Sequence, residues 1–215
     1  MHLNLPLWTQ VGANLLSLLL ALVLGWRPEL ILLLFWAENA VIGIWQIPRF
    51  YLADSAKLSQ HTGTERHTVT TGMHILGASF IAGFFTLHYG LFTFVHGSFV
   101  FELFLHEPLN AQNLADLAFS NNGLILALTG MFISHGIEFV QDIITGTART
   151  MKKEEVMSAP YKRIVIMHLV LIGSGFLLMS FPYPMVSVIL LIAIKIFFDV
   201  HSERKAISQW TGHVS

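Results

Sequence analysis

Histidine and carboxylate side chains stand inside long apolar stretches of this sequence, where an ionisable group is costly and needs a partner. The residues of this kind that could bind a metal ion are His88, His135, His168, Glu38 and Asp199. His135 and Glu138 are three residues apart, so on a helix both point from one face toward a common site. Because the chain contains no cysteine, the ligands would be imidazole and carboxylate groups, which suit Zn²⁺, non-haem Fe or Mn.

Such a centre would favour hydrolytic chemistry. Three protein ligands and a bound water form a catalytic zinc site, and Glu38 or Glu138 would serve as the general base. A substrate that reaches this depth in a membrane would be a lipid or another apolar molecule. The leading hypothesis is therefore a metal-dependent membrane enzyme that acts on a lipid-like substrate, although the sequence leaves open whether the protein is an enzyme.

Three other functions remain open. The first is electron transfer by a b-type haem protein, because His74 and His88 are fourteen residues apart on one predicted helix and could bind haem on the same face. The second is a proton-coupled transporter or channel, with Glu38, His88 and His135 as the relay. The third is a structural or assembly subunit, because polar networks also hold membrane helices together.

The elements that must position these residues are membrane-spanning helices. Apolar residues make up 54% of the 215-residue chain and charged residues only 12%, about half the share that is usual in soluble domains. Six continuous apolar runs each approach or exceed the roughly 20 residues that a helix needs to cross a bilayer. They cover residues 7–25, 29–47, 73–104, 122–145, 164–181 and 184–200. We expect an all-α, polytopic membrane protein with a single domain over residues 1–215.

The distribution of basic residues predicts the orientation of these helices. With six spans, one side of the membrane receives eleven of the 12 lysine and arginine residues, and the other side receives only Arg27. Cytoplasmic segments of membrane proteins carry such an excess of positive charge. The pattern predicts that both termini are cytoplasmic and that the protein lies in a cell (inner) membrane. The expected partners are membrane lipids, and nucleic acid is not expected.

Smaller features refine the expected packing. Gly83, Gly90 and Gly97 recur every seven residues on the third span, which lets another backbone or a flat cofactor approach closely. The segment 105–121 is expected to hold a short helix on the surface. No proline is expected to interrupt a span, and Pro48 is expected to flank the second one.

Several short motifs support a family resemblance. The run Phe35-Trp36-Ala37-Glu38-Asn39 is followed by Val41-Ile42-Gly43, and the third span carries His88-Tyr89-Gly90 and His96-Gly97. This combination resembles a family of bacterial multi-span inner-membrane proteins of unknown function, over most of the helical chain. The resemblance implies an inner-membrane location and no particular chemistry.

Overall fold

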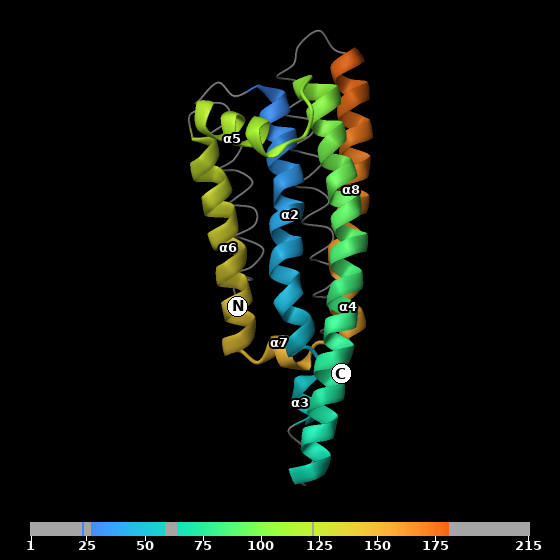
Figure 1. Ribbon diagram of the computed structural model, residues 1–215. Coiled ribbons are helices and arrows are strands. Elements are labelled where there is room, and N and C mark those ends of the chain that lie inside the picture. The colour runs from blue at the N-terminus through green and yellow to red at the C-terminus, as the bar shows by residue number, and fades with distance from the viewer. Residues whose placement is uncertain (1–22, 24–26, 59–63, 122, 181–215) are drawn as a thin grey trace, which may run out of the picture. The chain divides into compact units, whose positions relative to one another are not determined.

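The computed structural model describes residues 23, 27–58, 64–121 and 123–180, and this part of the chain is all-α. The long helices are α2 (Pro28–Leu52), α4 (Thr64–Phe99), α6 (Leu124–Ile144) and α8 (Lys153–Ser180). The short elements are α3 (Ser55–Leu58), α5 (Ala111–Ser120), α7 (Thr147–Thr150) and the π-helical segment η1 (Val100–Leu105), which continues α4. Figure 1 shows how they follow one another along the chain.

In the described part of the chain, four helices are long and apolar enough to cross a membrane: Glu29–Leu52, Thr71–Leu105, Leu124–Ile144 and Lys153–Gly173. They correspond to the second, third, fourth and fifth apolar runs of the sequence, so the all-α prediction is confirmed for the described residues. The predicted spans 7–25 and 184–200 lie outside the described residues, except for Val23 in the first. The total of six spans and the orientation of the termini therefore stay predictions.

Two helix boundaries differ from those that the apolar runs predicted. Helix α2 continues through Pro48 to Leu52 instead of ending at residue 47, so the expectation that this proline flanks the helix is wrong. Helix α8 begins at Lys153 rather than at residue 164 and contains Pro160. In both cases the apolar run stops at a charged residue, Arg49 or Arg163, that is paired inside the bundle rather than placed in water. An arginine with a partner therefore does not mark the end of a helix.

The chain divides into two compact units, one formed by residues 1–32 with 166–215 and the other by residues 33–165. The 33–165 unit contains the contacts that define the directions of its helices. Against α4, the hydrogen bonds of α2 join Trp36 with Thr93, Asn39 with Tyr89, and Tyr51 with Ser79. As the residue numbers rise along α2, the numbers of their partners on α4 fall, so these two helices are antiparallel.

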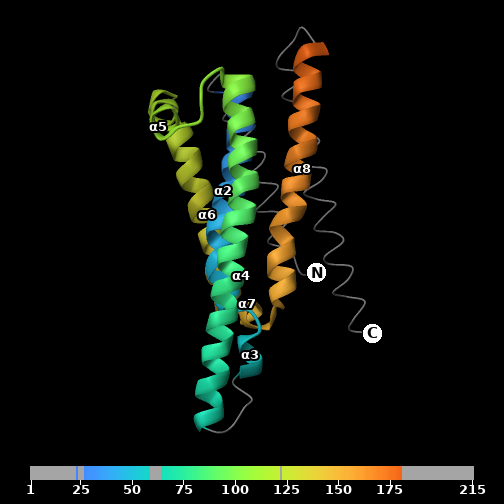
Figure 2. The ribbon, with the colours of Figure 1, turned by 45° about the vertical axis from the view of Figure 1, so that its right-hand side comes forward.

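The other two long helices follow the same alternation within the 33–165 unit. Contacts of α2 with α6 join Glu38 with His135, Trp45 with Phe139, and Arg49 with Asp142, so α2 and α6 run in the same direction. Contacts of α2 with α8 join Glu38 with Arg163 and Gln46 with Val156, so α8 runs the opposite way. Successive long helices thus reverse direction, as consecutive membrane spans must. Figures 1 and 2 show α2 beside both α4 and α6.

An aromatic and aliphatic core holds α2, α4 and α8 together. It contains buried side chains from all three helices, namely Phe50, Ala53, Ala82, Phe85, Tyr89, Val156 and Ile164. The rings of Phe85 and Tyr89 stack with centroids 4.7 Å apart, and Phe50 lies 5.2 Å from Phe85. Such offset aromatic packing adds stability beyond the buried area itself. This core lies beside the charged residues described below and fixes the helices that carry them.

Glycines let large aromatic rings approach the backbone at three places. A Cβ added at Gly97 would lie 2.5 Å from the Trp36 indole, and one at Gly136 would lie 2.8 Å from the Trp45 indole. A Cβ at Gly43 would lie 2.8 Å from the Tyr89 ring. Of the glycine series predicted on the third span, only Gly97 makes such an approach among the described residues. At the other two positions, 83 and 90, an added Cβ would meet nothing within 4 Å.

The short helix expected in segment 105–121 is present as α5. Its first turn is capped by Asn110, whose Oδ1 accepts a hydrogen bond of 2.8 Å from the Asn113 backbone N–H. Figure 1 shows α5 lying across the end of α6 rather than continuing along it. The turn between α5 and α6 uses Gly123 in the left-handed conformation, with φ of 83°.

Candidate functional site

The mid-helix carboxylate of α2 has a cationic partner. Glu38 Oε1 lies 2.8 Å from Nη2 of Arg163, which α8 contributes from the opposite direction. The two side chains keep only 16% and 24% of their surface exposed. A guanidinium at this distance forms a strong charge-assisted hydrogen bond with a carboxylate. The pair explains how a carboxylate is held inside an apolar bundle, where an isolated charge would be very costly.

His135 lies between two carboxylates that contact different ring nitrogens. Its Nδ1 is 3.0 Å from Oε2 of Glu138, one turn further along α6. Its Nε2 is 3.8 Å from Oε1 of Glu38 on the parallel helix α2. The structure therefore brings Glu38, His135 and Glu138 together, and the three-residue spacing in α6 accounts for the closer of the two contacts. We call these three residues with Arg163 the charge network.

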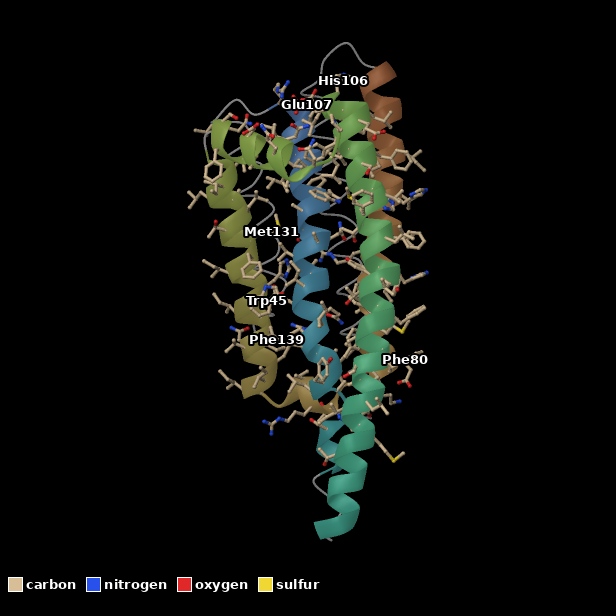
Figure 3. All side chains as sticks on the ribbon, in the orientation of Figure 1. Trp45, Phe80, His106, Glu107, Met131 and Phe139 are labelled. Atoms are coloured by element: carbon tan, nitrogen blue, oxygen red, sulfur yellow. The ribbon has the colours of Figure 1, made fainter. Side chains whose placement is uncertain are left out.

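A second ion pair follows on the same two helices. Arg49 Nη2 lies 2.9 Å from Oδ2 of Asp142, seven residues beyond His135. The Arg49 guanidinium also lies 5.6 Å from the centroid of the Phe139 ring, a cation–π arrangement. Figure 3 shows Phe139 and Trp45 in the seam between α6 and α2, where their ring centroids are 5.5 Å apart. This seam, which we call the α2–α6 seam, carries all the charged residues of α6.

The two histidines of α4 that the haem alternative named, His74 and His88, make separate contacts. His88 is exposed, its Nδ1 lies 2.8 Å from the Tyr161 hydroxyl, and its ring stacks on Phe84 with centroids 5.3 Å apart. His74 Nε2 lies 2.8 Å from the Ala53 carbonyl oxygen. One ring nitrogen of each histidine is thus engaged in a hydrogen bond. The haem alternative, which relied on this pair, stays a prediction.

The remaining predicted ligands are distributed elsewhere. His168 lies on α8 in the other compact unit, and its side chain is exposed. Asp199 lies outside the described residues. Of the five residues predicted to bind a metal, the structure brings together Glu38 and His135.

Within the described residues, no group of three or more histidine, aspartate and glutamate side chains is placed to hold a metal ion. The geometry of His135 gives the reason. Its two ring nitrogens point in different directions and each meets a different carboxylate, while Glu38 is also bound by Arg163. A Zn²⁺, Fe or Mn centre therefore stays a prediction that requires residues outside the described ones.

The sequence motifs that support the family resemblance pack against each other in the seam between α2 and α4. Trp36 Nε1 donates a hydrogen bond of 2.7 Å to the Thr93 carbonyl and its indole rests on Gly97. The Tyr89 hydroxyl donates one of 3.0 Å to the Asn39 carbonyl. Glu38 stands between Trp36 and Asn39 in the chain, so these contacts fix the turn of α2 that carries the carboxylate.

Arg163 and Arg49 were not identified as site residues from the sequence, where they counted only toward the orientation of the chain. The signal that could have identified them is the need of Glu38 and Asp142 for counter-charges. The sequence alone does not say which arginine is near which carboxylate, because that depends on how the helices pack.

Comparison with known proteins identifies a family without a known activity. A family described as a family of unknown function, DUF6498, matches residues 1–212. No curated protein and no solved structure matches the chain.

Proposed function

We propose that this chain, which belongs to the DUF6498 family, is a multi-pass membrane protein that moves protons through the charge network of Glu38, His135, Glu138 and Arg163. The observation that carries the proposal is the imidazole of His135 between two carboxylates inside a bundle of membrane-length helices. The proposal concerns proton-coupled transport rather than metal-dependent catalysis.

The membrane location is supported by the outward surface of α4. Large apolar side chains cover it, among them Phe80 and Leu87, each 78% exposed. Figure 3 shows Phe80 pointing away from the helices. A soluble protein rarely exposes so continuous an apolar surface, whereas lipid solvates it at no cost. The alternating directions of α2, α4, α6 and α8 are those of four consecutive spans.

The orientation is supported by the charges at the two ends of the helices. The end where α2 and α6 finish, which we call the basic end, carries Arg49, Arg149, Lys152 and Lys153. The opposite end carries the acidic residues Glu102, Glu107 and Asp116. By the positive-inside rule the basic end is cytoplasmic. Adding the predicted spans 7–25 and 184–200 places both termini on that side of a cell (inner) membrane.

The chemistry follows from the charges of the network. Two carboxylates and one guanidinium leave one negative charge, which a proton on His135 would neutralise. Imidazole is the side chain best suited to gain and lose a proton near neutral pH. In a medium of low dielectric constant, a change of one charge alters interaction energies strongly. Proton binding and release can therefore drive a change in helix packing, as proton-coupled transporters require.

Proton flux into vesicles tests the proposal. The purified protein would be reconstituted into phosphatidylethanolamine and phosphatidylglycerol vesicles that contain a pH-sensitive dye, and a potassium diffusion potential would be applied. We expect the wild-type protein to acidify the vesicles faster than protein-free vesicles. Removing a proton-transfer group typically costs roughly a hundredfold in rate, so Glu38→Gln should abolish most of the flux. Glu107→Gln, an exposed position outside the spans, should leave it unchanged.

Two results would overturn the proposal. Wild-type vesicles that acidify no faster than protein-free vesicles would exclude proton movement. A Glu38→Gln protein with wild-type flux would exclude the network as the path. Elemental analysis and an absorption spectrum of the same preparation examine the metal and haem hypotheses. Near-stoichiometric Zn, Fe or Mn that disappears in His135→Ala would favour the membrane enzyme acting on a lipid-like substrate instead.

A further inference from the structure

We infer that protons reach the charge network from the basic end only, through the α2–α6 seam, and that the Arg49–Asp142 pair forms the entrance. The inference rests on the proposed function, because it names the route by which that site exchanges protons. It adds Asp142 and Arg49 as functional residues. It also means that this structure represents the state of the protein that is open to the basic end.

Ionisable side chains form a continuous series along α6 toward the basic end. His135, Glu138 and Asp142 are spaced by three and four residues, so they lie on one face of the helix. Their side chains are 13%, 35% and 30% exposed, so contact with the surroundings increases beyond His135. Consecutive members are about one helical turn apart, a distance that a single bridging water can span. The series can therefore pass a proton between water and His135.

The entrance contains a buried hydrogen-bond donor, Nε of Arg49, that is open to a water molecule. Arg49 uses Nη2 for Asp142, while its Nε is buried and has no hydrogen-bond partner within the described part of the chain. A buried donor of this kind is normally satisfied by an ordered water. The pair thus supplies a polar, charge-balanced position where water can enter beside Asp142 without exposing an isolated charge to lipid.

The opposite direction is closed by apolar packing. On α2, the residues before Glu38 from Leu33 to Ala37 are all buried, with at most 9% of their surface exposed. On α6, residues 124–134 contain no titratable side chain. Trp36 further closes the neighbouring seam, because its indole occupies the space above Gly97 and is hydrogen-bonded to the α4 backbone. On α2, no titratable side chain lies between Glu29, in the first turn of the helix, and Glu38.

Single cysteines test this route directly, because the natural chain contains none. Glu138→Cys and Asp142→Cys would be compared with Ile137→Cys, which lies at the depth of Glu138 and is more exposed than either carboxylate, at 53%. Each variant in sealed vesicles would be treated with a membrane-impermeant methanethiosulfonate reagent, added to one side at a time. Thr147→Cys and Asp116→Cys, exposed positions at the basic and acidic ends, report the orientation of the protein.

We expect positions 138 and 142 to be labelled only from the side that labels position 147. Their labelling should be on the order of tenfold faster than that of position 137, because the reactive thiolate forms in water and not in lipid. Equal rates at 137 and 138, or labelling of 138 and 142 from the side of residue 116, would overturn the inference. Size-exclusion chromatography identifies a variant that fails to fold. If Glu138→Cys fails to fold, Gln141→Cys, an exposed position about one helical turn from residue 138, replaces it.

Proton flux separates this inference from the proposed function. If protons pass Asp142, Asp142→Asn should slow the flux, and a wild-type rate would overturn the route. If labelling follows the expected pattern while Glu38→Gln keeps wild-type flux, the water path stands and the proposed function fails. If Glu38→Gln abolishes flux while labelling comes from the acidic end, the proposed function stands and the route fails.

Discussion

Arg163→Gln is the substitution whose effect on stability follows most directly from the structure. It removes the positive charge that lies 2.8 Å from Glu38 Oε1 and leaves a shorter, neutral polar side chain. The carboxylate of Glu38 would then remain in a bundle that leaves only 16% of its side chain exposed. His135, a second neighbour of Glu38, is a full ångström further away at 3.8 Å. The variant thus exposes the cost of burying a charge that has lost its main partner.

The size of the effect can be estimated in two ways. Two unit charges about 4 Å apart attract each other by about 4 kcal/mol at the effective dielectric constant of about 20 that suits protein sites. Removing one partner of a buried ion pair costs about 3 to 5 kcal/mol in measured cases. Because Arg163 and Glu38 keep some exposure, the low end applies. We expect Arg163→Gln to lower the free energy of unfolding by about 3 kcal/mol.

Unfolding in detergent micelles, followed by circular dichroism against denaturant, measures this loss. The matched control is Lys162→Gln, which removes an equal charge from the adjacent exposed position and should change stability by about 0.5 kcal/mol or less. The double variant Glu38→Gln with Arg163→Gln should be more stable than the single Arg163→Gln protein, because no charge is then buried alone. Equal losses for Arg163→Gln and Lys162→Gln, or strict additivity in the double variant, would refute the reasoning.

Two further substitutions test the packing that positions the site. Gly97→Ala would place a Cβ 2.5 Å from the Trp36 indole and should lower stability by about 1 to 3 kcal/mol, whereas Gly90→Ala, which meets nothing within 4 Å, should not lower it. An equal response of the two glycines in the same unfolding assay would contradict the contact. Asn110→Ala removes the cap from the Asn113 N–H and should cost about 1 kcal/mol of α5 stability, seen as faster amide exchange in α5 alone. Unchanged exchange there would show that the cap is not needed.

The fourth span shows what the sequence could predict. Its apolar run, 122–145, matches α6 at Leu124–Ile144 almost to the residue, because glycine and polar residues bound it on both sides. The contact of His135 with Glu138 also followed from spacing, since residues three apart in one helix meet whatever surrounds them. Predictions succeeded where one helix alone determines the geometry.

The start of α8 shows where prediction from sequence failed. Lys162 and Arg163 end the apolar run, and a count of apolar residues treats both alike. In the structure Lys162 is exposed, whereas Arg163 lies against Glu38 on α2. The difference depends on the direction in which each side chain leaves the helix and on what packs there. Contacts between helices carry this information, and the sequence of one helix does not.

The position of α2 between its neighbours explains why the charges gather where they do. A charged side chain on an outer helix can extend to the membrane surface or turn toward lipid headgroups, but one on a helix flanked on several sides cannot. Each interior charge of α2 therefore takes its partner from a neighbour: Glu38 from α8 and α6, and Arg49 from α6. The result is two linked charge sites at successive depths. Such an arrangement is costly for a purely structural bundle, because apolar residues of equal volume would pack as well or better. Its presence along one seam favours a role in moving charge, and the flux of Glu38→Gln vesicles decides that question.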